Sequence, residues 1–308
     1  MSAKRHVSAS VGGQAVIEGV MMRGKRHWSL AVRRPDDGIG LHSEPLNPLA
    51  DRHRYFKLPV VRGVVGLWES LSLGMRALAM SANESRGEAE EDISKKEMGL
   101  SIAIGVILAV GLFVVLPLFV VRSVRGWLPD SSLFVLVEGL LRILILIAYI
   151  WAVSRIKQLR RVFEYHGAEH KTIHALEAGL ELVPENVKKF SPVHPRCGTN
   201  FLLIVMVLAI AVFSFVGVPG LLWLILSRLL GIPLIVGLSY EVIKYAGRHK
   251  DSQLMRFVMF PGLLLQKLTT REPDLSQIEV AIAALEGVAA AEPIEMDHDG
   301  RAEVEVMA

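Results

Sequence analysis

Three histidines recur at helical spacing in the segment EYHGAEHKTIHALEAG, which covers residues 164 to 179. Residues at i, i+4 and i+8 share one face of a helix, so His166, His170 and His174 should lie within about 80° of arc. Glu177 falls inside the same arc. Imidazole nitrogens and carboxylate oxygens are common ligands of divalent transition metals. The segment therefore predicts a helix with a metal-binding face.

The residue order in this segment also supplies a candidate catalytic group. His166, Glu169 and His170 fit the pattern H-x-x-E-H, in which two imidazoles hold zinc and the glutamate acts as a general base. A divalent ion lowers the pKa of a coordinated water molecule toward 7, and a nearby carboxylate can take its proton. We therefore expect Glu169 to be catalytic. The alternative is a polar helix at a membrane surface without metal, because Lys171 and Glu181 indicate partial solvation.

Further ligands are present in the segment SPVHPRCGTNF, residues 191 to 201. His194 and Cys197 lie three positions apart, and the turn-forming Pro195 and Gly198 can direct both side chains back toward the histidine helix. We predict that both residues bind the metal. Cys197 favours zinc over iron, manganese or nickel. The thiol could instead be a nucleophile or an inert packed side chain.

Two glutamates outside the histidine segment are the remaining candidates. Glu241 in SYEVIKYAG lies far downstream of His170, as the third ligand does in proteins with the H-x-x-E-H pattern, so we predict that it is a ligand. Glu18 in AVIEGVMMRG lies between apolar neighbours and precedes Arg23. A structural ion pair explains Glu18 as well as a ligand role does.

The elements that position these residues include membrane spans. The chain has 308 residues, of which 52% are hydrophobic, and a bilayer core about 30 Å thick needs roughly 20 apolar residues per helix. A VPG sequence must break the last long apolar stretch near residues 217 to 220. Glu138 and Arg142 lie at i and i+4 inside one span, where they can form a structural or a functional pair. The four predicted spans are residues 98–121, 133–153, 200–217 and 221–245.

The distribution of charge predicts the topology. The loop between the second and third spans and both flanks of the bundle are rich in Lys and Arg, whereas the other two turns hold few. By the positive-inside rule both termini and this loop lie in the cytoplasm, with the spans in the bacterial cytoplasmic membrane. The net charge of +3 therefore indicates lipid headgroups as partners and not nucleic acid. A single cysteine excludes an intrachain disulfide.

The chain thus reads as a mainly α polytopic membrane protein with a small N-terminal α+β region. In that region a DDG turn between alternating runs predicts a β-hairpin, packed on a glycine-punctuated strand and turn. Residues 58 to 82 predict an amphipathic helix at the membrane surface. The predicted parts are residues 1–97 (cytoplasmic region), 98–153 (two spans), 154–200 (histidine helix and loop), 200–245 (two spans), 246–290 (interfacial and C-terminal helices) and 291–308 (disordered acidic tail).

Five ordered motifs resemble an uncharacterised bacterial membrane-protein family called domain of unknown function 1385. They are GGQAVIEGVMMRG, YHGAEHKTI, HPRCGTNFL, GLSYEVIKYAG and LLLQKLTTREPD, and the resemblance runs from about residue 11 to 285. The family has been described as a predicted metal-dependent enzyme. The resemblance implies a site formed by His166, Glu169, His170, His194 and Cys197, with Glu18 and Glu241 as motif acids.

Two classes of function fit these observations. The first is a metal-dependent hydrolase that acts at the cytoplasmic interface on a lipid-linked or peptide substrate, with Glu169 as the general base. The second is a non-enzymatic transporter or assembly factor whose histidines bind a transported or structural cation. Four spans without evident repeats are few for a transporter, although a homo-oligomer could supply further helices.

Overall fold

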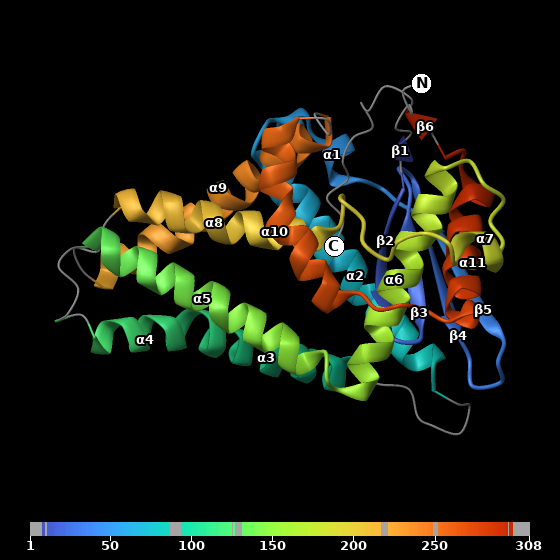
Figure 1. The fold of residues 1–308 in the computed structure, drawn as a ribbon, viewed down its shortest axis with the longest axis horizontal. Helices are drawn as coiled ribbons and strands as arrows, with labels where there is room; N and C mark the ends of the chain where they lie inside the picture. Colours follow the sequence, from blue (N-terminus) through green and yellow to red (C-terminus); the bar gives the residue numbers. More distant parts are fainter. Residues whose placement is uncertain are drawn as a thin grey trace.

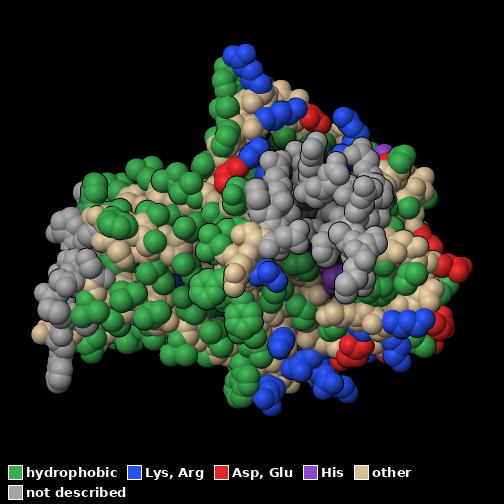
Figure 2. Space-filling model, turned by 45° about the horizontal axis from the view of Figure 1, so that its top comes forward, with side chains coloured by type: hydrophobic (Ala, Val, Ile, Leu, Met, Phe, Trp, Pro, Cys, Tyr) green, Lys and Arg blue, Asp and Glu red, His purple; other side chains and the backbone are tan. Residues whose placement is uncertain are grey.

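The computed structural model describes residues 8–9, 11–86, 94–124, 126, 131–216, 221–248, 252–294 and 296–297. The chain forms a bundle of long helices that projects from an α/β domain, which we call the sheet domain (Figure 1). On the face shown in Figure 2, hydrophobic side chains cover the bundle, whereas charged side chains gather toward the sheet domain.

A four-stranded antiparallel sheet forms the centre of the sheet domain. Its strands are β2 (Gly12–Val16), β3 (Gly19–Arg23), β4 (His27–Arg33) and β5 (Ile39–Pro45), and they are neighbours in chain order. The predicted hairpin is β4–β5, and its turn contains Asp37 at a φ of 63°. Asp36 Oδ1 accepts a hydrogen bond of 3.0 Å from the Gly38 N–H. The glycine-punctuated segment before it, predicted to be one strand and a turn, forms two paired strands, β2 and β3.

Helices cover both faces of this sheet. Because successive strand residues point to opposite faces, Met21 packs on one face with Leu73 of α2 (Val61–Glu84). Met22 packs on the other face with residues of α6 (Lys157–Glu177) and α11 (Leu275–Ala291). Helix α2, which covers most of the segment that we predicted to lie at the membrane surface, packs on the sheet and also contacts the membrane helix α9 (Leu221–Arg248).

Four helices among the described residues are long and apolar enough to span a membrane, in agreement with the prediction. They are Lys96–Ser123, Leu133–Val153, Gly198–Val216 and Leu226–Ala246. The first comprises α3 (Lys95–Val110), a π-helical turn η2 (Gly111–Val115) and α4 (Leu116–Ser123). The others belong to α5 (Ser131–Val153), α8 (Gly198–Val216) and α9 (Leu221–Arg248). The predicted turn at residues 217–220 lies outside the described residues.

The charges predicted inside the second span form a paired network. Arg142 Nη2 donates to Glu138 Oε1 at 2.5 Å, and Arg228 Nη2 donates to Glu138 Oε2 at 3.2 Å. Arg142 Nε also donates to the Phe113 carbonyl at 2.8 Å. The residue four positions later, Pro117, cannot donate to this carbonyl because proline has no N–H. Glu138 is only 3% exposed. The pair therefore joins three spans, which supports its structural reading.

The C-terminal part returns to the sheet domain. Helix α10 (Gln253–Thr269) packs against α8 and α5, and Asp274 caps the start of α11 by accepting a hydrogen bond from the Gln277 N–H. Beyond α11, β6 (Met296–Asp297) pairs with β1 (Ser8–Ala9) inside the segment predicted to be a disordered tail. Short helices complete the description: α1 (Leu49–Arg52), η1 (Arg54–Lys57) and α7 (Pro184–Val187).

Candidate metal centre

Helix α6 presents its histidines on one face, as their spacing predicted. The ring centroids of His166 and His170 are 4.4 Å apart. The His194 ring, from the loop before α8, lies 5.8 Å from His170 and 4.4 Å from His174. The four imidazoles therefore form one continuous row along the helix.

Two segments close over this face of α6. A Cβ at Gly167 would overlap the Arg271 carbonyl oxygen and approach Pro192 Cβ to 3.3 Å, so only glycine permits both segments to pass. The buried Gln266 of α10 holds the His194 loop with two bonds. Its Oε1 accepts from the His194 N–H at 2.9 Å, and its Nε2 donates to the His194 carbonyl at 2.8 Å.

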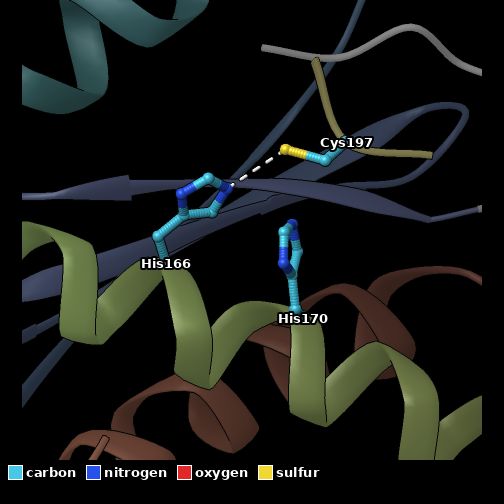
Figure 3. Close-up of side chains that lie close together, drawn as sticks. All are labelled: His166, His170 and Cys197. Carbon is cyan, nitrogen blue, oxygen red and sulfur yellow. Dashed lines mark hydrogen bonds between the residues drawn. The ribbon is translucent and has the colours of Figure 1, made fainter. Parts of the chain in front are cut away.

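The first group of candidate ligands comprises His166, His170 and Cys197, each of which offers one ligand atom within 4.8 Å of the others. Both rings rise from α6 toward the loop that carries Cys197 (Figure 3). Nδ1 of His166 lies 2.9 Å from the Thr269 carbonyl, and Nδ1 of His170 lies 2.6 Å from the Pro192 carbonyl.

These carbonyl contacts determine which ring nitrogen can bind an ion. A carbonyl oxygen can only accept, so Nδ1 of each neutral ring carries the hydrogen and Nε2 keeps its lone pair. Nε2 of His166 lies 3.3 Å from Cys197 Sγ. Metal-binding histidines typically donate their second ring N–H in this way. The first group could therefore hold a metal ion.

Glu169 lies buried beside the first group. Its Oε2 is 3.5 Å from His170 Nε2. Burial raises the pKa of Glu169 to about 7, although His166 and Arg196 act to lower it. A Cβ at Gly13 of β2 would lie 2.7 Å from Glu169 Cγ, so the strand approaches the carboxylate closely. The position suits a group that exchanges a proton near neutral pH.

The second group comprises His174, Glu177 and His194, whose ligand atoms also lie within 4.8 Å of one another. His194 Nδ1 accepts from the Arg196 N–H at 3.3 Å, and its Nε2 faces Glu177 Oε2 at 3.5 Å. The Arg196 guanidinium pairs with the other oxygen of Glu177. His174 Nε2 lies 3.0 Å from the Val193 carbonyl. Protein partners therefore already bond this group.

Both imidazoles of the second group are held neutral. Burial lowers the pKa of His194 to about 3, against the opposing effect of Glu177. Burial also lowers the pKa of His174, although its bond to the Val193 carbonyl acts in the other direction. Neutral imidazole is the form that binds metal ions.

The two distant glutamates lie elsewhere. Glu241 accepts from Arg62 Nε at 2.7 Å and from the Val60 N–H at 3.3 Å, so it fastens the start of α2 to α9. It does not join either histidine group. Glu18 bonds to Arg161 at 2.5 Å and lies 3.3 Å from the Tyr165 hydroxyl. Glu18 thus forms a structural ion pair, which was the alternative to a ligand role, and its partner is Arg161 and not Arg23.

The sequence interpretation missed two residues of this centre. Arg196 lies between His194 and Cys197 in the sequence, and we predicted no role for this residue. Gln266 interrupts the apolar run LLLQKL, and a lone amide in such a run was a signal of a buried hydrogen-bonding role. Neither residue type is a usual metal ligand, so a search for ligands passes over both.

Comparison with known sequences places the chain in a family. The profile of the family described as "Protein of unknown function (DUF1385)" matches residues 58–291, and the chain belongs to this family. It is similar to "Uncharacterized protein YqhQ" of Bacillus subtilis (strain 168), with 34% identity over 292 residues that cover 91% of this chain and 92% of that protein. No solved structure matches. The matched region includes both histidine groups.

Proposed function

We propose that this member of the DUF1385 family holds one divalent ion, preferably zinc, at His166, His170 and Cys197, and that it hydrolyses a substrate with Glu169 as the general base. The observation that carries the proposal is the pair of Nδ1 contacts to the Thr269 and Pro192 carbonyls. They leave the Nε2 lone pair of His166 3.3 Å from Sγ of Cys197, the only cysteine of the chain, and Nε2 of His170 3.5 Å from Glu169 Oε2.

The donor set fits the proposed ion. Two imidazoles and a thiolate are the ligand types of zinc sites, and three protein ligands leave a position open, as in catalytic sites. A zinc ion held there would act as a Lewis acid and lower the pKa of a coordinated water. The buried Glu169 can accept a proton from such a water and donate it to a leaving group.

The position of the site supports a substrate at the membrane surface. Cys197 immediately precedes α8, and the Thr269 carbonyl that orients His166 ends α10. Helix α8 is a candidate span and α10 packs against it, so the ligands would lie at the end of this span. We place this surface on the cytoplasmic side, because the segment of residues 154–200 that carries the ligands is rich in Lys and Arg.

Metal content tests the proposal first. The detergent-purified full chain, prepared without chelator and reloaded with zinc, should contain about one zinc ion per chain. His166→Ala with His170→Ala should remove it, whereas His53→Ala, which alters an exposed histidine, should not. Plasma mass spectrometry measures both. A zinc-free wild type after reloading would contradict the proposal.

Glu169→Gln tests the general base. This variant should keep the ion, because Gln preserves the packing, but it should lose hydrolysis. Wild type and variant are incubated with a membrane lipid extract, and mass spectrometry identifies products that only the wild type releases. A non-enzymatic metal protein would give the same product pattern for both.

A thiol nucleophile is the second candidate function. His166 Nε2 lies 3.3 Å from Cys197 Sγ, and the Thr199 hydroxyl donates to the same sulfur at 3.4 Å, which is the geometry of a Cys–His pair. Alkylation by iodoacetamide separates the two. A metal-bound thiolate should react only after chelation, whereas a free nucleophile should react at the same rate with and without the chelator.

A further inference from the structure

The second histidine group has no role in the proposed reaction, although it contains ligands of the right kind. His174, Glu177 and His194 bring their ligand atoms as close together as the first group does. The groups are adjacent, because the His170 and His194 rings are 5.8 Å apart. The same helix therefore carries two sets of three ligands side by side.

Arg196 distinguishes the second group from the first. Its guanidinium pairs with Glu177, the single carboxylate of the group, and the side chains of both residues are largely buried. A guanidinium is a permanent cation, and a buried divalent ion brought to the same carboxylate would meet that positive charge at short range. The only anionic ligand of the second group is therefore already neutralised.

We propose that His174, Glu177 and His194 form a second divalent-cation site that Arg196 keeps closed, so that Arg196 limits the centre to one ion. The proposal goes beyond the proposed function, which concerns only the ion of the first group. The second site consists of other ligands, so it can be tested separately. The contact between the Arg196 N–H and His194 Nδ1 is long at 3.3 Å. This N–H belongs to the backbone, so the contact persists in any Arg196 variant, and His194 would offer the ion Nε2, which already faces Glu177 Oε2 at 3.5 Å.

The chemistry of the two sites makes them distinguishable. The first site includes a thiolate, whereas the second offers two imidazoles and one carboxylate. Cobalt(II) occupies zinc sites and shows a strong ultraviolet absorption only where a thiolate is bound. Ion count and thiolate absorption therefore report on the two sites separately.

The test is a cobalt titration of the full chain in detergent, with bound cobalt measured by plasma mass spectrometry. Wild type should bind one ion with thiolate absorption. Arg196→Gln should bind two ions, and the second should add no thiolate absorption. Adding Glu177→Gln to that variant should return the count to one. Arg160→Gln is the matched control, and this variant should bind one ion. Arg160 also pairs with a glutamate, Glu164, but on the exposed side of α6.

Two outcomes overturn the proposal: a second ion in wild type, or no additional ion in folded Arg196→Gln. Arg196→Met, which keeps the apolar stem, repeats the test if the glutamine variant does not fold. The proposed function fails separately. Absence of thiolate absorption in every variant would remove the first site, while an additional ion in Arg196→Gln without that absorption would still establish the second.

Discussion

In the first histidine group, backbone carbonyls hold Nδ1 of each ring, while Nε2 of His166 lies beside Cys197 and Nε2 of His170 lies beside Glu169. In the second, His194 and Glu177 are already bonded to each other and to Arg196. The ligand types are similar, and in each group the ligand atoms lie within 4.8 Å of one another. The groups differ in the hydrogen-bond partners of their ligands and not in the number of ligands, and we expect those partners to decide which group binds an ion.

The largest expected difference between the groups is in stabilisation by the ion. Free zinc at about 100 times its Kd should stabilise the fold by about 2.7 kcal/mol through the first group. His174→Ala with His194→Ala should keep this effect, whereas His166→Ala with His170→Ala should lose it. Thermal melting with and without a chelator measures it in both variants.

Each of these variants loses two imidazoles, so both should lose a similar amount of stability from packing. The difference between melting temperatures with and without chelator, taken within each variant, does not include this loss. Equal chelator sensitivity of the two variants would show that both groups share the ion and would break the distinction.

Gln266→Ala should affect both groups together. It leaves the buried N–H and carbonyl of His194 without their partners, which should cost about 2 kcal/mol. The loop that it releases carries Cys197 as well as His194, so zinc affinity should fall too. Chemical denaturation and zinc titration are the measurements. Gln253→Ala, at the exposed start of the same helix, is the control; an equal loss there would remove the special role of Gln266.

Cys197→Ser should weaken only the first group. Serine is a poor ligand for a soft ion, so zinc affinity should fall at least about tenfold, or about 1.4 kcal/mol. Cys197 is the only cysteine, so cobalt loaded into the variant should show no thiolate absorption. Unchanged zinc affinity in a competition titration would place the ion in the second group.

The smallest expected effect comes from a pair of glycine substitutions. Gly13→Ala should cost about 1 kcal/mol, because its Cβ would press on Glu169 beside the first group. Gly66→Ala, in open space on α2, should stabilise the protein by up to about 1 kcal/mol. Opposite shifts of the denaturation midpoint would confirm the close approach of β2. A neutral Gly13→Ala would show that Glu169 has room to move.

Local patterns predicted the spans and the histidine face because each depends on one segment alone. An apolar run of about 20 residues can only satisfy its backbone in lipid as a helix. Spacing by four places His166 and His170 on one face whatever surrounds them. The β4–β5 hairpin likewise follows from its own turn, where Asp36 bonds to Gly38.

The prediction for Glu241 rested on sequence separation alone, and the structure brings Arg62 to it instead. An ion pair between residues so far apart leaves no local pattern. The burial of α11 is a similar case. Its apolar residues predicted a helix, but only the assembled domain shows that β3, β4 and α6 cover it.

Composition and periodicity are enough to predict four apolar spans, a histidine-bearing helix and a cysteine three residues after a further histidine. Which histidines lie beside Cys197 and which beside Arg196 depends on the packing of the folded chain. Carbonyls of Thr269 and Pro192, the amide of Gln266 and the guanidinium of Arg196 make that choice. Their contacts depend on how three segments that are far apart in the sequence pack together, and no periodicity in the chain predicts that packing.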